Sequence, residues 1–93
     1  NHDLAREFYK LALTFFQENK DEANAAATHF QLARSYSFAE IDKREYHNLQ
    51  ALAYYEQHAK QYTKELAECY NLEAIRLSYA EGVGESAFAM YHK

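Results

Sequence analysis

Residues 30–36, Phe-Gln-Leu-Ala-Arg-Ser-Tyr, share a pattern with residues 71–77, Asn-Leu-Glu-Ala-Ile-Arg-Leu. Each stretch has an alanine at its centre, Ala33 or Ala74, and a large side chain three residues further on. An alanine at a helix contact has so little bulk that a neighbouring helix can approach closely. The pattern therefore predicts two equivalent helices, each packed through its alanine against a neighbour.

The spacing of apolar residues predicts more helices on both sides of these stretches. Intervals of three and four residues are typical of one apolar helix face. They predict helices over residues 2–18, 21–40, 43–60 and 64–80, and a last helix from residue 85. The links are short, so neighbouring helices are expected to be antiparallel.

The composition agrees with a helical chain. The 93 residues include no proline and two glycines, which disfavours a β-sandwich or barrel with many tight turns. Apolar residues make up 48% and charged residues 26%, a balance typical of a folded globular domain. The expected fold is all-α, with a single domain over residues 1–93.

Several helix ends and faces can be specified from the sequence. Asp42 and Glu45 have the spacing of a capping box, with Ile41 and Tyr46 at the flanking staple positions, and Thr63 is a candidate cap for the fourth helix. The expected apolar stripe of residues 2–18 is Leu4, Phe8, Leu11, Ala12, Phe15 and Phe16. That of residues 43–60 is Tyr46, Leu49, Ala53, Tyr54 and His58.

A second repeated pattern, Ala-x-x-x-Tyr, marks the odd-numbered helices. It occurs as Ala5 to Tyr9, Ala51 to Tyr55 and Ala87 to Tyr91. Together the two patterns resemble the tetratricopeptide repeat, although the spacing here, about 41 residues, exceeds the 34 of that repeat. The resemblance implies antiparallel helical-hairpin repeats, about two to two and a half of them, stacked as a solenoid. We expect the chain to be part of a longer superhelix.

The stretch from Asp21 to Gln57 also resembles the Rap family of peptide-regulated response-regulator phosphatases. The residues that carry the resemblance are Asp21, Glu22, Ala27, Phe30, Leu32, Ala33, Tyr36, Tyr46, His47, Leu49, Gln50, Ala51, Leu52 and Tyr55. The family's repeat domain binds a short signalling peptide in its concave groove. In the family the phosphatase glutamine lies in an N-terminal bundle, and we expect none of these 93 residues to correspond to that bundle. The resemblance thus implies peptide binding and control of a response regulator, with no catalytic residue here and enzyme activity left uncertain.

Helical spacing from Ala33 and Ala74 gives candidate groove residues. An extended peptide needs hydrogen-bonding side chains beside apolar walls, and an asparagine can pair with both groups of a peptide backbone. Asn71 is the preferred anchor. The predicted groove residues are Phe30, Arg34, Ser37, Phe38, Glu68, Asn71, Ile75, Ser78 and Tyr79. The alternative is a generic tetratricopeptide-type scaffold for protein–protein interaction.

Other classes of function find less support. The net charge of -4 disfavours nucleic-acid binding, because phosphate contacts need a basic face. Three turns separate His47 from His58, so they cannot share a metal ion, and we expect neither a metal nor a cofactor. The lone Cys69 favours a reducing, cytoplasmic location, and no apolar run is long enough for a membrane helix. Exposed end helices make self-association plausible.

Overall fold

A computed structural model describes residues 2–81 of the chain, and every regular element in that range is a helix. The elements are α1 (His2–Glu18), α2 (Glu22–Ser35), the short 3-10 helix η1 (Phe38–Glu40), α3 (Ile41–Gln57) and α4 (Thr63–Glu81). The prediction of an all-α fold is confirmed for these residues. The helix expected from residue 85, with the Ala87–Tyr91 pattern, lies outside them.

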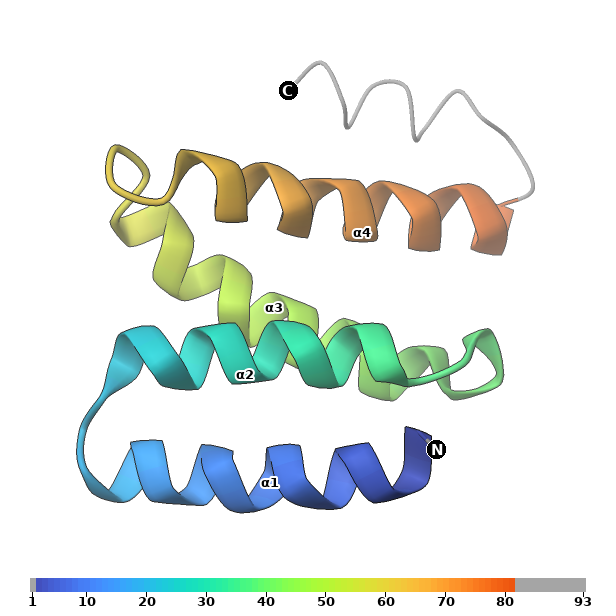
Figure 1. Cartoon of the computed structure of the whole chain (residues 1–93). Helices are drawn as coiled ribbons and strands as arrows, with labels where there is room; N and C mark the ends of the chain where they lie inside the picture. Colours follow the sequence, from blue (N-terminus) through green and yellow to red (C-terminus); the bar gives the residue numbers. More distant parts are fainter. Residues whose placement is uncertain (1, 82–93) are drawn as a thin grey trace.

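The helices pack in chain order. α1 contacts α2, α2 contacts α3, and α3 contacts α4. Figure 1 shows the chain reversing direction at each link, as the short links predict. Within residues 2–81, no helix combines the length and the apolar character needed to cross a bilayer. Because consecutive helices alone form these main contacts, α1 has a packed side toward α2 and an open side away from it.

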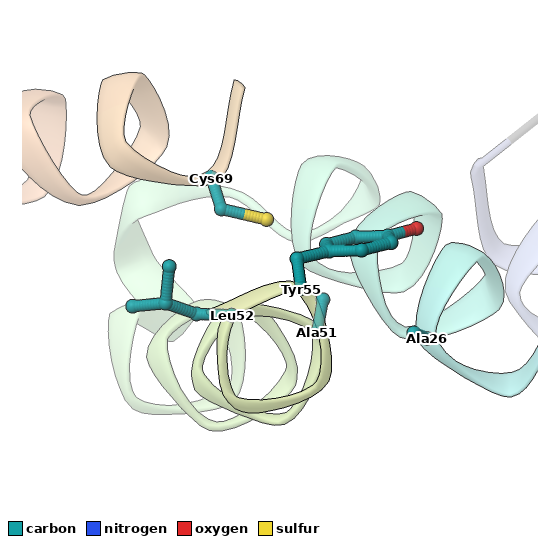
Figure 2. Close-up of a cluster of buried hydrophobic side chains, with 5 residues drawn as sticks. All are labelled: Ala26, Ala51, Leu52, Tyr55 and Cys69. Carbon is teal, nitrogen blue, oxygen red and sulfur yellow. The ribbon is translucent and has the colours of Figure 1, made fainter. Parts of the chain in front are cut away.

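The hydrophobic core lies where α2, α3 and α4 meet. It contains Ala26 from α2, Ala51, Leu52 and Tyr55 from α3, and Cys69 from α4. Figure 2 shows the Tyr55 ring reaching from α3 toward α2. The small side chains let the helices approach, and the aromatic ring fills the remaining space.

The link between α1 and α2 is a tight hydrogen-bonded turn. Lys20 has a φ of 57°, in the left-handed region, and its N–H donates to the carbonyl of Gln17 over 3.1 Å. The N–H of Asp21 donates to the carbonyl of Phe16 over 2.8 Å. This pair of bonds defines a Schellman motif. Asp21 then caps α2, accepting from the N–H of Asn24.

α2 ends at Ser35, five residues earlier than the sequence predicts. Tyr36 is extended, with φ -86° and ψ 146°, and the chain then enters η1. Two arginines hold the released carbonyls: Arg6 of α1 donates to Ser35 O and Arg44 of α3 donates to Tyr36 O, each over 2.6 Å. These long-range donors offset the lost helical bonds and explain the early end.

Two predicted caps are wrong. α3 begins at Ile41, so Asp42 lies inside its first turn and no side chain caps the helix at Glu40. η1 runs directly into α3 and leaves no room for the capping box. Thr63 is the first residue of α4, and its hydroxyl donates backward to the carbonyl of Ala59 instead of accepting from α4.

The repeated alanines are buried, but two predicted apolar stripes face outward. Ala33 and Ala74 are 0% and 1% exposed, as their pattern predicts. Tyr55 and Ala51 are buried in α3, whereas Ala5 and Tyr9 are half-buried in α1. The predicted stripes fail because a neighbour covers another face of each helix. The exposed members are Leu4, Phe8, Leu11 and Phe15 of the first stripe and Tyr46, Leu49, Ala53 and His58 of the second, whereas Ala12, Phe16 and Tyr54 are half-buried.

Candidate binding surfaces

The structure distributes the predicted groove residues over different environments. Phe30 is half-buried and packs against the core, so its main role is in helix packing. Arg34 is exposed, and its guanidinium lies 5.7 Å from the centre of the Phe30 ring. Ser37 is exposed, and its carbonyl accepts from the N–H of Glu40 in η1. The side chains of Phe38 and Tyr79 lie outside the described part of the structure.

The groove residues of α4 lie on or beside its exposed face. Asn71 and Ile75 are exposed and one turn apart, so they share a helix face. Glu68 and Ser78 are half-buried at the edges of that face. The Asn71 amide can donate and accept beside the apolar Ile75 side chain, which suits contact with a peptide.

Three of the shallow cavities among the described residues, at the α1–α2 link, where α1, α2 and α3 meet, and at the α3–α4 link, contain no predicted groove residue. One cavity, with a volume of about 330 Å³, is lined by residues of three helices and lies where α1, α2 and α3 meet. Gln17, Gln50 and Gln57 line it beside three alanines, and His29 and Tyr54 contribute rings. The predicted groove residues thus lie outside these three cavities, and Arg34, Asn71 and Ile75 stand on exposed faces of α2 and α4.

A pair of histidines connects α2 to α3, and the sequence analysis did not find it. His29 Nδ1 lies 2.9 Å from His47 Nδ1, so one ring must donate its proton to the other. Tyr36 stacks on His47, with 5.9 Å between ring centres and 3° between planes. Arg6 of α1 lies 4.7 Å from the centre of the Tyr36 ring. No local spacing reveals this pair, because its members come from different helices.

Burial keeps the two histidines neutral. Burial lowers the pKa of His29. It also lowers the pKa of His47 to about 4, with smaller contributions from the charges of His29 and Lys10. Protonation of both rings would leave no acceptor nitrogen between them, so the hydrogen bond would be lost and two positive rings would be in contact. Among residues 2–81, no three His, Cys, Asp or Glu side chains are grouped to hold a metal ion.

A buried polar network joins α3 to α4. The Asn48 amide, 1% exposed, donates to the carbonyl of Cys69 over 3.1 Å and to Glu73 Oε2 over 3.4 Å. Arg76 pairs with Glu73 and also with Glu45 Oε2, 3.0 Å away. The buried Glu73 charge is therefore compensated from both helices, which fixes the α3–α4 register.

Cys69 is a core residue in this setting. Its side chain is fully buried, and burial raises the pKa of its thiol to about 12, with smaller contributions from Glu68 and Glu65. The reactive form of a cysteine is the thiolate, which such a pKa suppresses at neutral pH. Cys69 thus serves packing instead of nucleophilic chemistry.

Comparisons with protein-family models, with curated proteins and with solved structures find no match to this chain.

Proposed function

We propose that this chain is a helical-repeat module that binds a short signalling peptide, as in Rap-like regulators, and that peptide binding controls its contact with a response regulator. The observation that carries the proposal is the exposed face of α4, where Asn71 and Ile75 stand one turn apart. An amide beside an apolar side chain can hold a peptide backbone and one of its side chains together. Arg34 on α2 adds an exposed cation.

The helical scaffold gives this proposal its physical basis. Ala33 of α2 and Ala74 of α4 are both buried, as two equivalent helices would require. Among the described helices the main contacts are between chain neighbours, which leaves outer faces of the helices available to ligands. A peptide that contacted both α2 and α4 would favour one arrangement of the array, which is how binding could change a distant contact.

The test is a titration of the folded chain with a pool of pentapeptides, followed by backbone amide NMR. We expect shifts that centre on residues 71–75. Asn71→Ala should weaken the affinity of a selected peptide by about 10-fold, since an asparagine that loses its backbone partners costs roughly 1.4 kcal/mol. Lys60→Ala, at an exposed position on the α3–α4 link, is the matched control and should leave affinity unchanged. Absence of any shift at millimolar peptide would contradict the proposal.

The second candidate function is a generic tetratricopeptide-type scaffold for protein partners. The specific observation in its favour is the line of exposed apolar side chains on α1. The test is whether the wild-type chain retains a response regulator or another protein. Loss of that protein with Leu11→Glu, and no displacement of it by any pentapeptide, would favour this candidate over peptide sensing.

A further inference from the structure

The outer side of α1 carries four large apolar residues in one line. Leu4, Phe8, Leu11 and Phe15 are 57%, 63%, 67% and 62% exposed. Their successive spacings of four, three and four residues place them on one narrow stripe, which we call the α1 seam. The exposed Glu18 takes the next position of this spacing and ends the seam.

The α1 seam is larger than scattered surface hydrophobics. A large apolar side chain has a surface on the order of 150–250 Å². The four side chains of the seam, each about 60% exposed, therefore leave roughly 500 Å² of apolar surface in contact with water. This is near the upper end of the patches that monomeric proteins tolerate, and such patches usually mark an interface. The face of α1 toward α2 is already occupied, so the seam needs a different partner.

The order of residues in the seam makes it complementary to itself. Leucine and phenylalanine alternate along the stripe. When two α1 helices are set antiparallel about a two-fold axis between Phe8 and Leu11, Phe8 meets Leu11 of the second copy. Leu4 then meets Phe15 of the second copy. Each large ring thus faces a smaller side chain, and no ring faces a ring.

The residues that flank the seam permit this pairing. On one flank Glu7 comes opposite Thr14 of the second copy, so no like charges meet across the axis. Glu7 keeps its ion pair with Lys10, at 3.9 Å, which lies away from the seam. On the other flank Ala5 and Ala12 are small and half-buried, so the helices can approach closely.

We propose that the α1 seam is the contact between two copies of this chain, paired antiparallel about a two-fold axis. Two such surfaces bury roughly 1,000 Å² in total, at the low end for a specific interface. The dimer should therefore be weak, with a dissociation constant of about 10–100 µM, and it should exchange rapidly with monomer. This surface is separate from the proposed peptide face on α4.

The test is sedimentation equilibrium of the 93-residue chain from about 5 to 500 µM. The wild-type chain should shift from monomer to dimer over this range. Leu11→Glu should weaken association at least 100-fold, because it places a carboxylate against Phe8 of the second copy. Leu49→Glu, which changes an exposed leucine on α3, is the matched control and should leave the dimer intact. Circular dichroism of both variants should show unchanged helix content.

Cross-linking determines the orientation. In a Cys69→Ala background, chains with Leu4→Cys should cross-link through a short bismaleimide to chains with Phe15→Cys, whereas Leu4→Cys chains should not link to one another. A chain that remains monomeric at 500 µM overturns the proposal. So does a dimer that survives Leu11→Glu, or one that links Leu4→Cys to itself. Peptide titration reads out α4 independently, so either proposal can fail alone.

Discussion

Apolar residues follow helical spacing both around α3 and on the outer side of α1. Around α3 neighbouring helices bury them, whereas on α1 they are exposed. Around α3 the buried cluster combines the small Ala26, Ala51 and Cys69 with the larger Leu52 and Tyr55 side chains. On α1 the seam presents long leucine and phenylalanine side chains to water. Helical periodicity thus identifies apolar faces, whereas a face closes only where a neighbouring helix approaches it, which the small side chains around α3 permit.

Truncation of one leucine in each region should give the largest difference. Leu32 is fully buried, so Leu32→Ala should lower the free energy of unfolding by about 3 kcal/mol through lost burial and a residual cavity. Leu11→Ala at 67% exposure should change it by less than about 0.5 kcal/mol in the monomer. Urea denaturation followed by circular dichroism at 5 µM measures both. Equal losses would contradict the contrast between the two regions.

Acid should destabilise the chain through the histidine pair of the closed region. The folded state disfavours protonation of His29 and His47. Below about pH 6.5, the ordinary pKa of histidine, the unfolded chain therefore binds more protons than the folded chain. The stabilising effect of the neutral pair is complete above pH 6.5 and is lost as the pH falls toward 4, the pKa of His47. Between pH 7 and pH 5 the loss should be on the order of 2 kcal/mol.

The matched variants for this prediction are His47→Gln and His58→Gln. The first removes the titrating partner at the α2–α3 interface and should flatten the dependence of unfolding free energy on pH between 6.5 and 5. The second changes an exposed histidine at the end of α3 and should keep the wild-type slope. Parallel slopes for all three proteins in urea titrations at several pH values would show that the pair does not govern acid stability. Residues that face the pair are Lys10 from α1, Tyr36 from the α2 end and Tyr46 from α3.

The smallest effect is expected at the link that orients α1. Lys20 adopts a φ of 57°, which costs a residue with a Cβ about 1–2 kcal/mol, while glycine adopts it freely. Lys20→Gly should raise the free energy of unfolding by about 0.5–1 kcal/mol after the added entropy of the unfolded chain. Lys60→Gly on the α3–α4 link, where φ is not positive, should lower it instead. Thermal unfolding of the two variants compares them, and destabilisation by both would show that the turn is not left-handed at Lys20.

The sequence predicted the helices and their buried alanines, but not which face of each helix a neighbour covers. The limits of α1 and the polar cap at Asp21 follow from local spacing and side-chain chemistry. The early end of α2 does not, because Arg6 and Arg44 reach it from other helices. The His29–His47 pair and the Asn48–Glu73 contact are also long-range, so no local pattern contains them. A neighbouring helix, not periodicity alone, selected the covered face of α1.

The most direct test of this account is solvent accessibility of leucine methyl groups in NMR spectra of a dilute, methyl-labelled chain with a soluble paramagnetic agent. At about 5 µM, below the expected dissociation constant, monomer is the larger fraction, and we predict strong line broadening for Leu4 and Leu11 and protection for Leu32 and Leu52. The same agent at about 500 µM protein should spare Leu11 as the seam becomes covered. Protection of Leu11 at the lowest concentration, or broadening of Leu32 equal to that of Leu11, would contradict the division between a closed interior and an open α1 seam.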